Sequence, residues 1–159
     1  MRTTALLIAI TIMGCSSPTL PEERDLRAAQ ARWDARAFPD YEMDIRIGCF
    51  CPPDVAEWSR VRIVGGIVTE VMRLSDSTVL APNLWTMWQS IDQIFERLRG
   101  VHGSDVYAHF TATFDPALGF PREANLVERP NVADAGIAWS IRRVAPLPPT
   151  ALVGHLPLE

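Results

Sequence analysis

Residues 41–74 read YEMDIRIGCFCPPDVAEWSRVRIVGGIVTEVMRL, and the pattern of this stretch decides the fold class. In its first part the apolar residues stand at alternate positions, which are Tyr41, Met43, Ile45 and Ile47. Such alternation predicts a strand with one buried face. Residues 58–64 and 67–74 are predicted to be two further strands, because Gly65-Gly66 between them is typical of a two-residue hairpin turn. Three consecutive antiparallel strands are therefore expected.

The same order of elements recurs in the second half of the chain. A helix over residues 22–37, which carries an apolar stripe and ends before Pro39, precedes the first three strands. Ser90, with Gln93 three residues later, forms a capping box that begins a second helix, and Gly100 ends it. Three more strands are expected after this helix, at residues 106–114, 123–128 and 137–144.

Together these elements predict an α+β fold in which a helix plus three antiparallel strands occurs twice. Strands that follow one another in this way form an antiparallel sheet, and the amphipathic helices pack on one face of it. The residues show no convincing repeat, so the duplication concerns the structure only. Residues 75–89, between the hairpin and the second helix, are expected to form a long loop.

The length and composition of the chain fit one globular domain. It has 159 residues, of which 48% are hydrophobic and 21% are charged. We place a single α+β domain at residues 22–145 and a loosely held, proline-rich tail at residues 146–159. The net charge of −4 lacks the basic excess that nucleic-acid binding requires, so no nucleic-acid partner is expected.

The N-terminus has the pattern of a bacterial lipoprotein precursor. Arg2 precedes an apolar run that is shorter than the roughly 20 residues of a membrane-spanning helix, so residues 1–14 are expected to be a signal peptide. Ile12-Met13-Gly14-Cys15 resembles the lipobox, in which the cysteine is lipidated and becomes the first residue of the mature protein. Residues 15–21 then comprise the lipidated Cys15 and a tether.

This pattern also predicts where the protein is located. The lipid on Cys15 makes the membrane a partner and places the domain in the cell envelope, outside the cytoplasm. Ser16 stands where a retention-type Asp would keep a lipoprotein at the inner membrane. In a Gram-negative cell we therefore expect the outer membrane, with the domain facing the periplasm.

Cys49 and Cys51 form the one pair in the sequence that suggests disulfide, redox or metal chemistry. In a regular strand, residues two apart share a face with their Cα atoms roughly 6.5 Å apart, at the outer limit of disulfide reach. Pro52-Pro53 directly after them favours a bend that brings them closer. Outside the cytoplasm a disulfide is the expected state. A buried reduced pair and a redox or metal-binding pair are the alternatives.

Other catalytic or metal-binding patterns are missing from the sequence. None of the three histidines has the spacing of a zinc ligand pair, so no metal and no cofactor is expected; they are His102, His109 and His155. No nucleophile elbow, phosphate-binding glycine loop or metalloprotease helix motif occurs. The Cys-X-Cys pair also lacks the helix N-terminus that activates a dithiol. We therefore expect no catalytic residue.

The five tryptophans have two interpretations. Trp85 and Trp88 lie just ahead of the second helix, whereas three others lie on predicted helices and strands: Trp33, Trp58 and Trp139. Packing in the core is the simpler interpretation, since tryptophan buries a large area. The functional interpretation is an exposed aromatic patch that binds an envelope protein or a glycan.

Several of these residues, in their order along the chain, point to a known family. The first half contributes Trp33, Tyr41, Cys49-Phe50-Cys51-Pro52, Val61-X-Ile63 and Gly65-Gly66. The second half adds Ile91-Asp92-Gln93-Ile94-Phe95, Phe114-Asp115 and Gly119-Phe120-Pro121. Across residues 24–144 the chain resembles the DUF6174 family, bacterial proteins of unknown function that are mostly secreted or lipid-anchored. The resemblance implies the fold and the envelope location but no reaction, and the acidic cluster typical of the family is reduced here to Asp134-Ala135-Gly136.

The sequence therefore favours a lipid-anchored envelope protein that binds a partner and is not an enzyme. The alternative is a thiol-based redox or metal-binding envelope protein that uses Cys49 and Cys51. A hydrolase would need carboxylates or histidines that converge on one pocket, and only the tertiary structure places such groups.

Overall fold

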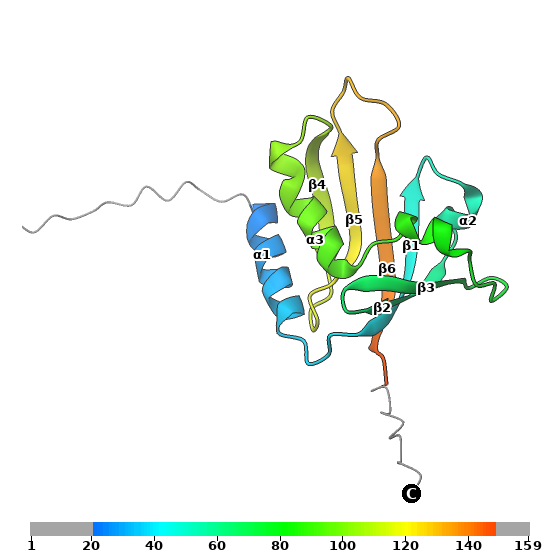
Figure 1. Cartoon of the computed structure of the whole chain (residues 1–159). Helices are drawn as coiled ribbons and strands as arrows, with labels where there is room; N and C mark the ends of the chain where they lie inside the picture. The colour runs from blue at the N-terminus through cyan, green and yellow to red at the C-terminus, as the bar shows by residue number, and fades with distance from the viewer. Residues whose placement is uncertain (1–20, 149–159) are drawn as a thin grey trace, which may run out of the picture.

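The computed structural model describes residues 21–148. Within them, six strands form an antiparallel sheet in the order β3-β2-β1-β6-β5-β4 (Figure 1). The strands are β1 (Tyr41–Cys49), β2 (Ser59–Val64), β3 (Ile67–Arg73), β4 (Tyr107–Phe114), β5 (Pro121–Glu128) and β6 (Ile137–Pro146). The helical segments are α1 (Pro21–Asp34), α2 (Pro53–Ala56), η1 (Pro82–Met87), α3 (Ile91–Arg99) and η2 (Gly100–Gly103). The predicted α+β class, with two groups of three antiparallel strands, is confirmed.

The two groups of strands become one sheet through the pairing of β1 with β6. This ladder runs from Tyr41 opposite Pro146 to Cys49 opposite Ile137, with a register shift between Asp44 and Ile45. Since β1 and β6 lie almost 100 residues apart in the chain, no local sequence pattern predicts that they pair. The first strand and the last strand therefore form the centre of the sheet.

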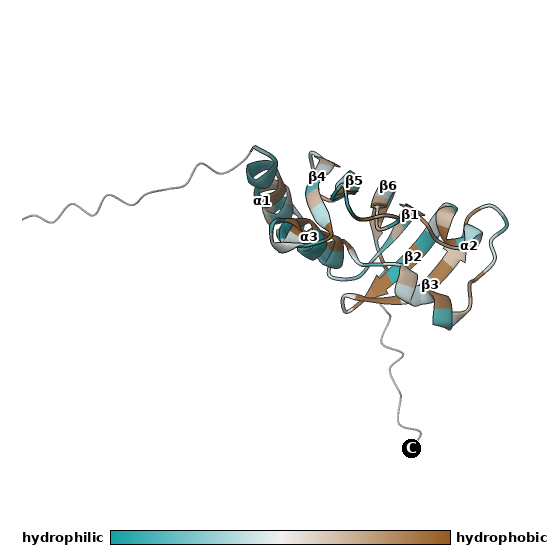
Figure 2. Ribbon diagram, turned by 90° about the horizontal axis from the view of Figure 1, so that it is seen from above, coloured by the Kyte–Doolittle hydropathy of each residue, from teal (hydrophilic) through white to brown (hydrophobic). Residues whose placement is uncertain are grey.

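Helices α1 and α3 cover one face of the sheet (Figure 1). Seen from above, the sheet curves, and β2 and β3 turn toward the side that carries the helices (Figure 2). The β1 residues predicted to point inward are all buried on this side: Tyr41, Met43, Ile45 and Ile47. The core thus lies between the concave face of the sheet and the two helices, as the sequence predicted.

Helix α1 ends at Asp34, three residues earlier than the apolar stripe suggested. The reason is a turn in which the Arg36 N–H bonds to the Trp33 carbonyl oxygen at 3.2 Å. The Arg36 guanidinium then folds back over the Trp33 ring, with its Cζ 4.0 Å from the ring centroid. The residues after Asp34 therefore leave the helix, although their apolar spacing continues the stripe.

The segment predicted as a long loop, residues 75–89, contains more structure than expected. It holds η1, which Pro82 begins, and a bridge that pairs Val79 with Met72 of β3. The sequence prediction also missed the short helices α2 and η2. Strand β6 continues to Pro146, so the first residue of the predicted tail belongs to the sheet.

The ends of the chain fall outside the described residues. The predicted signal peptide (1–14), Cys15 and the tether up to residue 20 belong to this part, as do residues 149–159 of the predicted tail. Of the helices in residues 21–148, none combines the length and the apolar character needed to cross a membrane.

Candidate functional site

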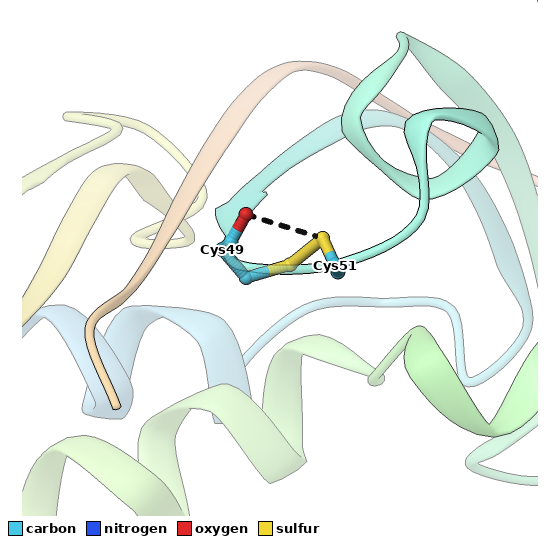
Figure 3. The surroundings of a disulfide bond; sticks show 2 residues. All are labelled: Cys49 and Cys51. Atoms are coloured by element: carbon cyan, nitrogen blue, oxygen red, sulfur yellow. Dashed lines mark hydrogen bonds between the residues drawn. A yellow bond between two sulfur atoms is a disulfide. The ribbon is translucent and has the colours of Figure 1, made fainter. Parts of the chain in front are cut away.

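Cys49 and Cys51 lie at the point where β1 ends. Their sulfur atoms are joined in a disulfide, and their Cα atoms are 5.2 Å apart (Figure 3). The Cys51 sulfur also contacts the Cys49 carbonyl oxygen at 3.5 Å. The chain bends after Cys49, so the Cα atoms are closer than the roughly 6.5 Å of a regular strand.

The residue between the two cysteines is the most exposed large apolar side chain of residues 21–148. Phe50 is 88% exposed, whereas Cys49 and Cys51 are half-buried and pack against the core. Pro52 and Pro53 follow directly and lead into α2. This disulfide tip, residues 49–53, therefore holds one aromatic ring out in solvent on a short and constrained piece of backbone.

Of the histidines considered as metal ligands, the two that the structure describes do not join the cysteines. His102 in η2 lies with its Nε2 atom 2.8 Å from Oε1 of Glu23, at the start of α1. His109 is exposed on β4, and His155 lies outside the described residues. Across residues 21–148, His, Cys, Asp and Glu side chains form no group of three or more that could hold a metal ion.

A groove of about 770 Å³ opens between β3, the segment before α3, and α3 itself. β3 supplies Ile67 and Val68 to it. The segment that includes η1 supplies residues of mixed character, among them Trp85, Trp88 and Gln89. One face of α3 supplies polar and charged groups, which are Gln93, Glu96 and Arg97. Their spacing of three and four residues places them side by side on the helix.

Two buried polar atoms at this groove have no hydrogen-bond partner in the described part of the chain. Trp88 is only 2% exposed, yet its indole Nε1 donates to no atom there. The side-chain oxygen Oε1 of the next residue, Gln89, is also buried and unpartnered. An unpaired buried polar group costs about 1–3 kcal/mol. An unsatisfied donor and an unsatisfied acceptor thus lie on consecutive groove-lining residues, both beneath the surface.

The neighbouring groove residues are held in place by hydrogen bonds. The Trp85 indole N–H donates to the Leu80 carbonyl oxygen at 2.9 Å. The Gln93 side chain accepts from the Ser90 N–H at 2.9 Å, which completes the capping box that the sequence predicted. Arg97 donates to the Tyr107 hydroxyl oxygen at 3.3 Å. The groove is therefore largely preformed.

The face of the sheet opposite the helices carries a second cluster of charged residues. Asp44 is 5% exposed and accepts a hydrogen bond from Arg60 at 2.8 Å, and this bond raises the pKa of Arg60. Arg142 and Arg46 lie over the Trp58 ring, with their Cζ atoms 4.3 and 5.3 Å from its centroid. The buried carboxylate is paired and the arginines are stacked, so this cluster is structural.

The five tryptophans lie in three different parts of the structure. Trp33 and Trp139 are fully buried in the core, which matches the simpler interpretation. Trp58 lies on the opposite face of the sheet, and only Trp85 and Trp88 line the groove. The groove's other residues could not be predicted as site residues from the sequence, because three separate segments form the groove. The pair of tryptophans was the one sequence signal that pointed to it.

The disulfide tip and the groove both lie inside the part of the chain that a family model matches. The model of DUF6174, a family of unknown function, matches residues 25–146. The chain belongs to the DUF6174 family. In this DUF6174 member the matched residues include the disulfide tip, the groove and all six strands. No match to the chain was found among curated proteins or among solved structures.

Proposed function

We propose that this DUF6174 protein is lipid-anchored through Cys15 in the cell envelope and acts by binding a partner at the groove. The lipobox pattern supports the anchor, and in a Gram-negative cell it favours the periplasmic side of the outer membrane. The observation that carries the binding role is the Trp88 indole N–H, which is buried at the groove with no partner among the described residues.

The composition of the groove also supports recognition of a partner. Protein interfaces are enriched in Trp and Arg and place a polar rim around an apolar centre. Here Trp85 and Ile67 supply apolar surface, while α3 supplies the polar side. A partner that accepts a hydrogen bond from Trp88 recovers the cost of the unpaired donor. The lining residues include no Ser, Cys or His, so we propose binding rather than catalysis.

The anchor is tested by the intact mass of the protein from native membranes, without reductant, before and after thiol alkylation. We expect a mass that includes lipid on Cys15 and no alkylation of Cys49 or Cys51. The Cys15→Ser variant should lose the lipid and leave the membrane fraction. A wild-type protein that carries no lipid contradicts the proposed anchor.

The binding role is tested with two matched variants of the full chain in detergent-solubilised envelopes. Ile67→Asp places a charge at the groove on a side chain that is 68% exposed, so the core is untouched. Val79→Asp is the control, because Val79 is 55% exposed and does not line the groove. We expect the wild type and Val79→Asp to be cross-linked to the same envelope components. Ile67→Asp should no longer be cross-linked to them. Equal retention by all three removes the groove as the site, and no retention by any contradicts the binding role.

The position of the disulfide favours a second candidate, a thiol-based redox protein that uses Cys49 and Cys51. The bond lies in a surface tip beside the exposed Phe50, where a reductant can reach it. Such a function requires a reduction potential well above about −300 mV, the upper limit of most structural disulfides. Equilibration in glutathione buffers, followed by alkylation, measures this potential. A Cys49–Cys51 pair that stays oxidised at potentials below about −300 mV removes the redox candidate. Metal bound in stoichiometric amount by the reduced chain would instead support a metal-binding function.

A further inference from the structure

The outer edge of β3 is paired along its second half only. The Leu80 N–H donates to the Val71 carbonyl oxygen, and the Arg73 N–H donates to the Thr78 carbonyl oxygen, each at 2.9 Å. Residues 67–70 have no such partner on this side among residues 21–148. Half of this sheet edge is therefore free to form further backbone hydrogen bonds.

The free half of the edge borders the groove. Ile67 and Val68 both line it, and Val64 and Ile67 face each other across the two-residue hairpin turn. Residues that flank such a turn exchange hydrogen bonds with each other, so the backbone N–H and C=O of the next residue, Val68, point away from β2. The groove thus has unpaired strand backbone on one side and the polar face of α3 on the other.

We propose that the groove binds an extended segment of another protein, which adds to the free half of β3 as an extra strand. This inference rests on the proposed binding function and names the class of its partner. Backbone pairing with a sheet edge gives such segments affinity, and side-chain pockets give them specificity. The partner segment continues the strand-like pairing that residues 78–80 already make with the second half of β3.

The chemistry of the groove favours a peptide over a glycan. A peptide amide and a sugar hydroxyl each accept and donate, so the unpartnered Trp88 N–H and Gln89 oxygen suit either ligand. The unpaired backbone of β3 is what favours a peptide. The exposed Ile67 side chain offers an apolar contact for a side chain of the segment, and an unpaired strand edge matches the spacing of peptide backbone groups. Glu96 and Arg97 provide opposite charges on α3, so the groove selects no single charge in its partner.

The probe is a phage-displayed library of random dodecapeptides, selected on the full chain in detergent micelles. We expect the selection to enrich sequences that bind with micromolar affinity. Val68→Pro removes one edge N–H without touching the β2–β3 hydrogen bonds, and an edge strand tolerates it. It should weaken binding about tenfold, whereas Val68→Ala, which keeps the N–H, should weaken it about threefold or less. Circular dichroism and thermal unfolding are used to check that both variants are folded.

A second measurement follows the floor of the groove. In the ¹⁵N–¹H spectrum the indole signal of Trp88, assigned through Trp88→Phe, should shift when an enriched peptide is added. Trp88→Phe should also bind that peptide more weakly, and circular dichroism checks that the variant is folded, because Trp88 is buried. Peptides that bind Val68→Pro as well as wild type, or that leave the Trp88 signal unmoved, overturn the proposed pairing.

The outcomes for this inference and for the binding function are distinguishable. If no peptide is enriched, but soluble peptidoglycan fragments bind in a way that Ile67→Asp abolishes, the peptide inference fails and the binding function stands. If neither the peptides nor the peptidoglycan fragments bind at the groove, and cross-linking at the groove retains no envelope protein, both proposals fail.

Discussion

The Trp33 indole N–H donates to Oδ1 of Asp92 at 3.0 Å, a hydrogen bond between residues 59 positions apart. Trp33 lies near the end of α1 and Asp92 lies in the first turn of α3, so the bond ties the two helices together. Arg36 reaches the other carboxylate oxygen at 3.5 Å while it stacks on the Trp33 ring. A carboxylate at this end of α3 is also favoured by the helix dipole. The Asp92 carboxylate thus links α1 to α3 and lies at the favourable end of the α3 dipole.

Asp92→Ala is expected to destabilise the fold by about 2 kcal/mol, because it leaves the buried Trp33 N–H without an acceptor. Urea unfolding monitored by tryptophan fluorescence measures the loss. Asp105→Ala, at an exposed position, is the control and should change stability by less than about 0.5 kcal/mol. Equal effects of the two substitutions would show that the Trp33–Asp92 bond contributes nothing.

Stability should fall at alkaline pH because of Tyr41. Burial raises the pKa of this phenol above its usual value, and its oxygen accepts the Ile91 N–H at 2.9 Å. The unfolded chain releases the Tyr41 proton from about pH 10, while the folded chain retains it. The contribution of Tyr41 to the free energy of unfolding is therefore complete below about pH 10 and is lost as the pH rises further.

The expected loss is about 1.4 kcal/mol per pH unit above that point. The chain contains two tyrosines and no lysine, so few other groups titrate there. Urea unfolding at a series of pH values measures the slope. Tyr41→Phe should start from a lower stability, because it loses the bond to Ile91, but show a flatter slope. A slope that Tyr41→Phe leaves unchanged rules out Tyr41 as its source.

Gly119→Ala is expected to destabilise the protein by about 2–4 kcal/mol. Gly119 has a φ of +83°, and a Cβ there would overlap the Ala29 carbonyl oxygen and lie 2.9 Å from Arg32 Cβ on α1. Gly100→Ala is the matched control, since a Cβ at Gly100 meets no atom within 4 Å and its φ is −73°. Thermal unfolding compares the two, and a Gly119→Ala variant as stable as Gly100→Ala would contradict the close packing of this turn on α1.

The double variant Cys49→Ser, Cys51→Ser should still fold, with a loss of at most about 1.5 kcal/mol, because the bond closes a loop of only three residues. Urea unfolding of wild type with and without reductant measures the same quantity, and the double variant should not respond to reductant. A variant that fails to fold would mean that the pair supports much more of the structure than the tip.

The sequence predicted the elements whose signal is local. Alternating residues in 41–47 and the Gly65-Gly66 turn predicted β1 to β3, and Ser90 with Gln93 predicted the start of α3, because strand period, turn backbone and helix cap each depend on residues within a few positions. The same locality explains the error at α1. The apolar stripe continues to residue 37, but Arg36 contacts Trp33 and the distant Asp92, and the helix ends before it.

What the sequence determined by itself is therefore the α+β class, the order of the strands along the chain, the family resemblance and the proximity of Cys49 to Cys51. The tertiary structure alone decided that β1 pairs with β6, that Trp33 meets Asp92, and that Trp88 lines a groove beside a half-free β3 edge. These contacts join residues far apart in the chain, and they form because buried faces and unpaired backbone groups find partners only when the whole chain packs.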